Sequence, residues 1–397
     1  MTSFFNRERF GKPQFLAGAL LLVFLMQCLW LTRVHLRSTL PASGDGLRIQ
    51  AGLDQFAGKQ VAGVPDGGET DGGKPDPDHS PLWYIISAAP RYVSHAPADN
   101  ANFSYAGWLD RVPYFIAGLL LGASLWYVAR RLYSNAGGYL ALFLYCFSPA
   151  MIRTSALAGS QPELHAAWGA YGAIFTAIAV AHTLYAPREV VLWNWRRITL
   201  LGLSLAMAIG TQFSLAVLVV FTLAFLLYLA PERRGAAMVI WAAACTVALV
   251  VLSSAYFFHF SALWRSLHHA RFIEFSTGAF AFSGSYYRLA QALHGASPTL
   301  AFLLPAAIMV WIFWRRARYF GNTSALLMAV ACLVLGLAAP HYSGQGFLLV
   351  AVPFLFTFVA GVFADLIDTR HGRHIRAALY GLLGSFAAWN LFTLARL

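Results

Sequence analysis

The residues best suited to chemistry are charged side chains that stand at the edges of apolar stretches. Asp45 lies between Gly44 and Gly46, shortly after the first apolar stretch ends. An Asp in this place can cap a helix by accepting hydrogen bonds from its first N–H groups. It can also act as a general base that removes a proton from an acceptor hydroxyl. The two roles are compatible, and we predict that Asp45 is the catalytic residue.

Three further side chains occupy similar edges and are predicted to bind substrate. His79 precedes Pro81 and an aromatic pair, Arg111 opens an apolar stretch, and Glu163 opens another. The guanidinium of Arg111 has a suitable shape for phosphate, and an acid beside a membrane cavity is a functional candidate. Each residue also has an ordinary explanation: a polar loop for His79, contact with headgroups for Arg111, and a favourable helix dipole for Glu163.

The elements that position these residues are helices in a membrane. Of the 397 residues, 59% are hydrophobic and 11% are charged, whereas soluble domains are about a quarter charged. Repeated apolar stretches of about 20 residues match the thickness of the bilayer. We predict an all-α polytopic membrane protein, with residues 1–397 as a single transmembrane domain. About eleven spans are predicted, at 13–33, 110–129, 136–153, 163–185, 198–211, 213–230, 235–257, 298–314, 323–339, 346–367 and 376–395.

The pair of spans at 198–230 depends on where the basic residues lie. Gly210–Gln212 offers a turn near the middle of this apolar stretch. With two spans and a cytoplasmic N-terminus, Arg130–Arg131, Arg233–Arg234 and Arg315–Arg316 all face the cytoplasm, as the positive-inside rule requires. A single span would place the later basic clusters on the opposite side. The sequence therefore predicts two short spans, which the bilayer accommodates by local thinning.

Two long segments, 34–109 and 258–297, are predicted to face the extracytoplasmic side. The first carries two short helices, around 47–56 and 81–93, of which the aromatic-rich second one is typical of the membrane interface. Between them, residues 61–78 are rich in Gly, Pro and Asp and are predicted to be mobile. The second segment and a short loop near residue 341 supply the remaining candidate substrate-binding residues: Arg265, Arg271, Arg288, His341 and Tyr342.

Several kinds of site are disfavoured. The chain has no GxxxxGK[ST] or GxGxxG nucleotide motif. Its four cysteines lie in apolar stretches without CxxC spacing and are predicted to pack rather than to form disulfides. His268–His269 has no third ligand at a metal spacing, so we predict no metal site. The net charge of +12 fits orientation in a membrane better than binding of nucleic acid.

These residues, in this order, resemble the GT-C superfamily of membrane glycosyltransferases, in particular the protein O-mannosyltransferase and aminoarabinose transferase branch. The resemblance covers residues 1–230 through motifs and the rest through topology. Its motifs are Asp45-Gly46, His79-Ser80-Pro81-Leu82-Trp83-Tyr84 and Arg111-Val112-Pro113, with further pattern matches at Ala129–Tyr133, Phe147–Pro149 and His341–Tyr342. The family's acidic pair is usually Asp-Glu, so this chain lacks the second acid. Within residues 1–397 we expect no large C-terminal soluble domain of the kind that some relatives carry.

The resemblance implies an inverting glycosyltransferase that moves a hexosyl or pentosyl group from a polyprenyl-phosphate donor. Asp45 would deprotonate a hydroxyl of a lipid, glycan or protein acceptor. Cations on the outer side would stabilise the departing lipid phosphate, with Arg111 favoured among the candidates. No cofactor is implied; a divalent metal is possible but unsupported, and no nucleic acid partner is expected. The predicted location is the bacterial inner membrane, with an extracytoplasmic active site.

Three other functions fit parts of the sequence. A transporter or flippase would need polar or broken helices near the midplane, and the spans are almost free of charge there. A non-catalytic membrane scaffold would keep the spans and tolerate loss of Asp45. A membrane acyltransferase of another fold would show a His-centred motif, which His79 supplies only weakly.

Overall fold

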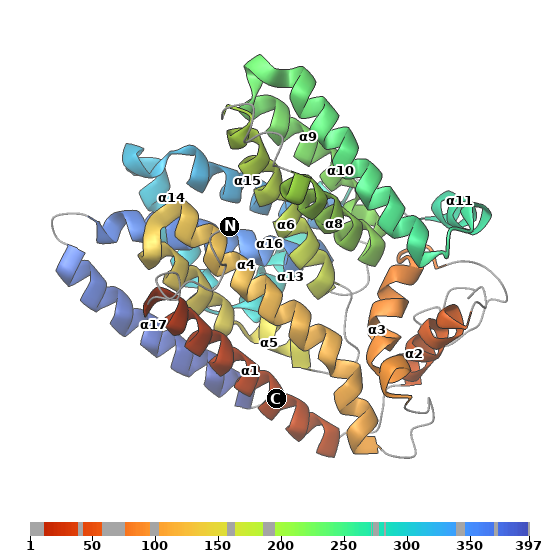
Figure 1. The fold of residues 1–397 in the computed structure, drawn as a ribbon. Coiled ribbons are helices and arrows are strands. Elements are labelled where there is room, and N and C mark those ends of the chain that lie inside the picture. The colour runs from red at the N-terminus through yellow and green to blue at the C-terminus, as the bar shows by residue number, and fades with distance from the viewer. Residues whose placement is uncertain are drawn as a thin grey trace. The chain divides into compact units, whose positions relative to one another are not determined.

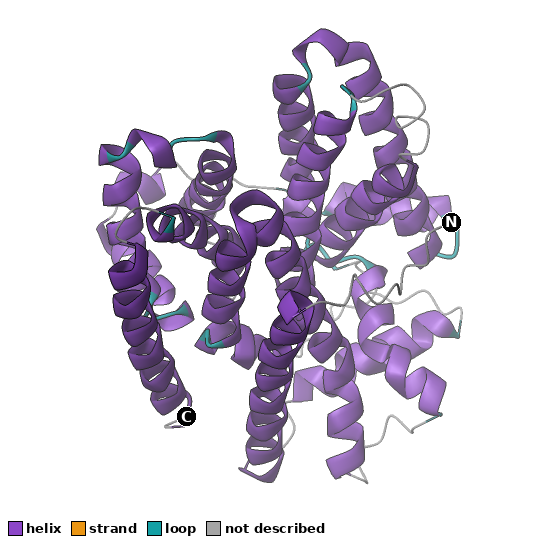
Figure 2. Ribbon diagram, turned by 60° about the vertical axis from the view of Figure 1, so that its left-hand side comes forward, coloured by secondary structure: helices purple, strands orange, loops and turns teal. Residues whose placement is uncertain are grey.

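The structure is a computed structural model. It describes residues 12–38, 43–57, 76–95, 103–156, 163–185, 195–270, 272, 278–281, 283–338, 346–368 and 372–395. Helices make up almost all of these residues, and no strand occurs among them (Figure 2). The prediction of an all-α protein is confirmed.

Figure 1 shows the helices coloured in chain order. Their bounds are α1 Lys12–Ser38, α2 Ser43–Phe56, α3 Pro81–Ser94, α4 Phe103–Cys146, α5 Pro149–Ala156, α6 Glu163–Thr183, α8 Trp195–Thr211, α9 Val217–Leu229, α10 Arg234–Ala255, α11 Phe260–His269, α12 Gly278–Ala281, α13 Ser283–Ala296, α14 Leu300–Phe313, α15 Phe320–Ala338, α16 Gly346–Ile367 and α17 Gly372–Ala395. Three 3-10 turns join some of them: η2 Phe213–Ala216, η3 Pro231–Arg233 and η4 Arg315–Ala317.

Within the described residues, seven helices are long and apolar enough to cross a membrane. An eighth span results if α13 and α14, which meet at a bend of 105°, count as one. The chain is thus an integral multi-pass membrane protein, but the predicted count of eleven spans is not confirmed. The predicted spans 110–129 and 136–153 correspond to the two parts of α4, which meet at a kink where Ser134 has a positive φ of 79°, and the second predicted span continues into α5. The predicted spans 198–211 and 213–230 are helical but short.

The chain reverses between α8 and α9, as the division of residues 198–230 predicts. A Cβ atom on Gly202 would meet Ala244 and Val247, and one on Gly210 would meet Leu252, so α8 and α10 run in the same direction. The next helix, α9, ends at Leu229, and only four residues separate this end from the start of α10 at Arg234. Helix α9 therefore runs antiparallel to α10. The Val219 carbonyl of α9 accepts a hydrogen bond from the Trp241 indole N–H of α10.

Two compact units make up the fold. Unit 1 consists of residues 1–31, 118–156 and 275–397, and unit 2 of residues 32–117 and 157–274. In each unit one helix is buried on nearly all sides: α16 in unit 1 and α6 in unit 2. Both helices are apolar around their whole circumference, as a central helix must be. The four cysteines are free thiols, three of them buried, in agreement with a packing role.

The two short helices predicted after the first span, α2 and α3, belong to unit 2 and pack against each other (Figure 1). Gly52 makes this close approach possible, because a Cβ atom there would lie 2.4 Å from the Tyr84 carbonyl oxygen. In turn α3 packs against α8 and α10. The predicted mobile segment falls mostly outside the described residues, which resume at Asp76.

Candidate functional site

The centre of the candidate site is a carboxylate–imidazole pair in unit 2, just before α3. The Asp76 Oδ2 and His79 Nδ1 atoms lie 3.0 Å apart, and the two side chains are only 10% and 13% exposed. Asp76 also accepts hydrogen bonds from the Tyr84 hydroxyl and from the backbone N–H groups of Asp78 and His79. These contacts fix the imidazole and leave its Nε2 atom to face another group.

The pair holds opposite charges. Burial by itself disfavours the cationic imidazole, but the charge of Asp76 and its hydrogen bond outweigh burial and raise the pKa of His79 above its usual range. The carboxylate of Glu163 adds to this effect on the pKa. Burial likewise opposes ionisation of Asp76, yet the charge of His79 and the hydrogen bonds from His79 and Tyr84 lower its pKa. The site therefore carries a protonated histidine to higher pH than a free imidazole would.

A row of aromatic side chains connects this pair to α4 and α6. The His79 ring packs on Trp83, with centroids 4.5 Å apart. The Trp83 indole N–H donates to the Tyr114 hydroxyl over 3.3 Å, and Ser87 lies 3.2 Å from the same hydroxyl. The edge of the Tyr114 ring then meets His165 at 5.0 Å. The N-terminal parts of α3, α4 and α6 thus meet around one cluster.

Buried charged side chains also occur on the same three helices. The Arg91 guanidinium donates two hydrogen bonds to the Asp110 carboxylate, at 2.6 and 2.7 Å, and Arg91 is 2% exposed. Arg111 follows directly and is itself buried, at 4% exposure. Because it lies three residues before Tyr114, the two share one face of α4. Glu163 is also buried, and it is the first residue of α6.

The segment from Asp76 to Ser80 is held against the turn between α8 and α9. The Ser80 hydroxyl donates to the Gly210 carbonyl over 2.7 Å and accepts from the Leu82 N–H, which caps α3. The Phe213 N–H donates to the Asp78 carbonyl over 3.0 Å. Gly210 permits this approach, because a Cβ atom there would lie 2.6 Å from Leu82. Secondary structure on both sides therefore fixes the position of His79.

Three buried polar side chains near this turn have unused hydrogen-bonding capacity. In the described part of the chain, no hydrogen bond is made by the Gln212 amide, the Ser214 hydroxyl or the Nδ1 atom of His165. Buried groups of this kind normally have a partner in water or a ligand. These three side chains therefore have capacity for a bound water or ligand.

The structure brings two predicted substrate-binding residues, His79 and Glu163, close enough for their charges to interact. Arg111 lies on the face of α4 that carries Tyr114. Asp45 lies in the first turn of α2, so it is inside the helix rather than ahead of it, and its side chain is outside the described residues. Arg265 is exposed on α11 of unit 2, and Arg288 belongs to α13 of unit 1. Arg271, His341 and Tyr342 lie outside the described residues.

Sequence reasoning missed Asp76 as a site residue. Its spacing from His79 was the available signal, since a carboxylate three residues before an imidazole can reach it across one turn. The sequence also gave no reason to connect Tyr84, Tyr114 and His165, which meet only through packing of three helices. Among the described residues, no three His, Cys, Asp or Glu side chains come together as metal ligands would.

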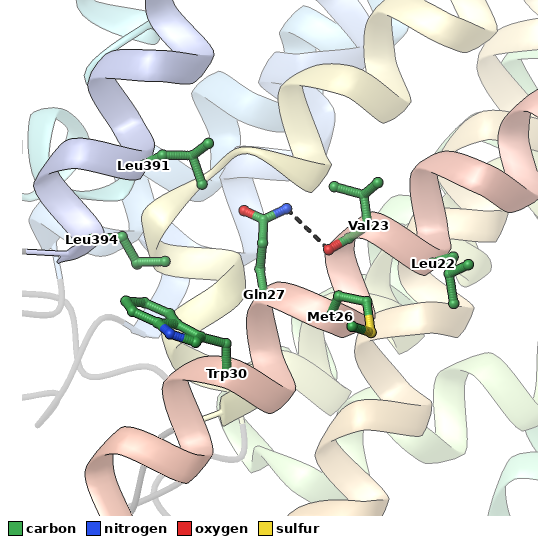
Figure 3. Close-up of a pocket in the computed structure, with 7 residues that line it drawn as sticks. All are labelled: Leu22, Val23, Met26, Gln27, Trp30, Leu391 and Leu394. Atoms are coloured by element: carbon green, nitrogen blue, oxygen red, sulfur yellow. Dashed lines mark hydrogen bonds between the residues drawn. The ribbon is translucent and has the colours of Figure 1, made fainter.

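Unit 1 contains a region of the opposite character. A groove of about 580 Å³ runs between α1 and α17 and is lined mainly by apolar side chains (Figure 3). Gln27 projects into it and donates to the backbone carbonyls of Val23 and Cys146. The residues that line the groove are Leu22, Val23, Met26, Gln27, Trp30, Leu391 and Leu394.

Comparison with known proteins identifies the fold. No family model and no curated protein matches the chain. Solved structures do match: ArnT from Cupriavidus metallidurans, bound to undecaprenyl phosphate, has a TM-score of 0.63 at 13% identity. The archaeal oligosaccharyltransferase AglB from Archaeoglobus fulgidus, in complex with an inhibitory peptide and a dolichol-phosphate, has a TM-score of 0.60 at 12% identity.

Both neighbours are GT-C superfamily membrane glycosyltransferases. The matched regions cover 86% of this chain and 59% of ArnT, and 96% of this chain and 55% of AglB. The chain therefore spans less than two thirds of the length of either neighbour. At these identities the likeness establishes a shared fold, and the resemblance to the GT-C superfamily is confirmed at that level.

Proposed function

We propose that this chain with the GT-C fold transfers a sugar from a polyprenyl-phosphate donor to an acceptor hydroxyl at the extracytoplasmic membrane surface. The observation that carries the proposal is the buried Asp76–His79 pair at the start of α3, in which the charges of Asp76 and Glu163 help to raise the pKa of the imidazole. A cation held in a poorly solvated place suits the phosphate of a lipid-linked sugar. The neighbours with bound undecaprenyl phosphate and dolichol-phosphate support this choice of donor.

His79 has the task of binding the donor phosphate. Asp76 holds its Nδ1 atom, so Nε2–H is the atom that donates to a phosphate oxygen. As the sugar departs, this oxygen gains negative charge, and the hydrogen bond becomes stronger. Arg111 is the second cation proposed for the phosphate, because its guanidinium can donate two parallel hydrogen bonds.

Asp45 has the task of general base. Its carboxylate removes the proton of the acceptor hydroxyl, and the resulting oxygen attacks the anomeric carbon. The bond between that carbon and the phosphate oxygen breaks on the opposite side, so the configuration inverts and polyprenyl phosphate leaves with the bonding electrons. Asp45 is assigned this task by the resemblance of the Asp45-Gly46 motif, and its backbone lies in the first turn of α2.

The proposal is tested with purified protein in nanodiscs and a panel of radiolabelled polyprenyl-phosphate sugars. Loss of donor and appearance of labelled product are followed for the wild type, Asp45→Asn and His79→Gln. Asp54→Asn is the matched control, since Asp54 is an acid on the same helix whose carboxylate accepts from Gln50. We expect Asp45→Asn to lower transfer about 10²–10⁴-fold, as loss of a general base does, and Asp54→Asn to leave it unchanged.

Each result has a definite meaning. Transfer that survives Asp45→Asn would remove Asp45 as the base while keeping the reaction class. Equal loss in Asp45→Asn and Asp54→Asn would point to disruption of α2 rather than to chemistry. Donor that is bound and translocated across proteoliposomes without being consumed would favour a flippase and contradict the proposal.

A further inference from the structure

A short helix after the α10 span has three distinct faces. Figure 1 shows α11 directly after the C-terminal end of α10. Leu263 and Ser266 are buried against the protein, whereas Phe260 and Trp264 are 66% and 73% exposed. At about 100° per residue, these two aromatic residues lie on one side of the helix. The third face is polar and exposed.

Basic side chains occupy that third face. Arg265, His268 and His269 are exposed. At about 100° per residue, Arg265 lies about a quarter turn from Trp264 and nearly opposite the buried Leu263, whereas His268, four residues after Trp264, lies at the border with the aromatic face. A short helix with one aromatic and one cationic face is the pattern of a helix that lies in the plane of a membrane interface.

The connection between α10 and α11 adds two more exposed rings. Phe257 and Phe258 have positive φ values of 50° and 58° and are 45% and 56% exposed. Their N–H groups donate to the Ser254 and Ser253 carbonyls, which ends α10. Glycine is the usual residue in this left-handed conformation. Large rings in its place, exposed and at the end of a membrane span, suit insertion between headgroups and acyl chains.

From these observations we infer that α11 is an interfacial anchor that binds the surface of the protein's own bilayer. Phe257, Phe258, Phe260 and Trp264 enter the boundary of the acyl chains. Arg265, with His268 and His269 when protonated, contacts the phosphates of anionic lipids. Continuity with the α10 span places the aromatic face at the right depth, and the positive charge complements an anionic surface.

The anchor is connected to the candidate site by Tyr256. Its hydroxyl donates to the Ser266 hydroxyl of α11 over 2.7 Å. The phenol is also close enough to Asp76 for that carboxylate to contribute to its raised pKa, after the larger effect of burial. In addition, the Gln55 amide donates to the Ala255 carbonyl and ties α2 to the same end of α10. The depth of α11 in the interface therefore sets the depth at which the Asp76–His79 pair meets the lipid surface.

The first test maps the faces of α11 in nanodiscs. Single cysteines replace Phe260, Ser261, Trp264 or Arg265 in a full-length chain whose four native cysteines are changed to alanine, and each is spin-labelled. Labels at positions 260 and 264 should collide with oxygen, and labels at 261 and 265 with a water-soluble nickel chelate. Nickel access at all four positions, or exclusion of both reagents as at a protein interface, would overturn the inference.

The second test separates membrane binding from protein packing. If Phe257 and Phe258 serve the bilayer, changing both to glycine should keep or raise the thermal midpoint in detergent, since the backbone conformation favours glycine. In nanodiscs the same change should raise nickel access at position 264. A lower midpoint with unchanged nickel access would show that the rings pack against protein, which contradicts the inference.

The third test addresses charge. Replacing phosphatidylcholine by phosphatidylglycerol should lower nickel access at position 264. Arg265→Gln should reduce the preference of α11 for phosphatidylglycerol over phosphatidylcholine about fivefold, as expected for the loss of one basic residue at an anionic surface. Arg196→Gln is the matched control, because Arg196 is equally exposed but lies on α8. An equal response of the two variants, or no dependence on phosphatidylglycerol, would overturn the role of Arg265.

Discussion

Polar groups are placed differently in the two compact units. In unit 2, the Asp76–His79 pair and Glu163 lie at the starts of α3 and α6, and α3 also contributes the buried Arg91–Asp110 pair and the bond from Trp83 to the Tyr114 hydroxyl. In unit 1, the groove between α1 and α17 has a single amide side chain, Gln27, among apolar ones (Figure 3). One region is built to hold charge and the other to contact hydrocarbon.

The difference follows from where each region lies along its helices. The first turn of a helix has unpaired N–H groups and a partial positive charge, which together favour polar and acidic partners. The middle of a membrane span has its backbone groups paired internally and faces hydrocarbon, so its surface is apolar. Variants in the two regions should therefore have effects of different size and kind.

The largest effect on stability is expected from the buried ion pair of unit 2. Arg91→Met leaves the Asp110 carboxylate largely buried without its guanidinium and should lower the free energy of unfolding by about 3–5 kcal/mol. Thermal and denaturant unfolding in detergent measure the change. The double variant Arg91→Met, Asp110→Leu should regain most of the loss, because it removes both charges. A double variant as unstable as the single one would argue against this account.

The largest effect on chemistry is expected at His79. His79→Gln keeps a donor but removes the positive charge, and it should lower transfer about 10²–10³-fold, as loss of one donor to a developing anion does. The thermal midpoint should change little by comparison. Transfer at the wild-type rate would remove His79 from the phosphate site.

The pH dependence tests the same residue through Asp76. The pKa of His79 is raised in the folded protein by the charge and hydrogen bond of Asp76, so the cation is lost only as the pH rises through a value above that of a free imidazole. Transfer should therefore fall on the alkaline side. Asp76→Asn removes the charge that raises the pKa and should move this fall to lower pH. A profile that does not move would contradict the role of the pair.

Helix packing in unit 2 should be sensitive to one added methyl group. A Cβ atom at position 52 would lie 2.4 Å from the Tyr84 carbonyl and 2.5 Å from Ala88 Cβ. Gly52→Ala should therefore force α2 away from α3 and destabilise the fold by about 1–3 kcal/mol. Unfolding measurements check this. Gly381→Ala on α17 is the control, since a Cβ atom there meets nothing within 4 Å.

A smaller effect is expected from the cap of α3. Ser80→Ala removes the acceptor for the Leu82 N–H and the donor to Gly210, and should lower the free energy of unfolding by about 1 kcal/mol. Ser80→Thr keeps both functions and serves as the control. Equal stability of the alanine variant and the wild type would show that the cap contributes nothing.

The smallest effect is expected in the groove of unit 1. Gln27→Leu removes an amide oxygen that is buried without a hydrogen bond in the described structure, together with the two long bonds, of 3.2 and 3.3 Å, that the amide nitrogen donates. Because these effects oppose each other, stability should change by less than about 1 kcal/mol in either direction. The matched variant in unit 2 is Gln55→Leu, which loses the bond to Ala255 over 3.0 Å and should be destabilising. A larger loss of unfolding free energy in Gln27→Leu than in Gln55→Leu would contradict the proposed difference between the two regions.

The sequence by itself determined the helical membrane class and much of the chain path. Composition and the length of apolar stretches do this, because the cost of exposing polar backbone to lipid leaves helices as the solution for such stretches. The basic residues also identified the reversal near Gln212, and Pro81 after Ser80 marked the start of α3. The division between the predicted spans 110–129 and 136–153 coincides with the kink at Ser134, but the sequence did not predict that α4 begins as early as Phe103.

Only the tertiary structure decided which polar residues act together. His79, Arg111 and Glu163 were predicted one by one from their positions at helix starts. Their grouping with Asp76, Tyr84 and Tyr114 depends on the close approach of helices that are far apart in the sequence, which Gly52 and Gly210 permit. Charges and pKa values depend on distance and burial in three dimensions. The sequence therefore specifies which residues are suited to the site, and helix packing decides which of them lie in contact.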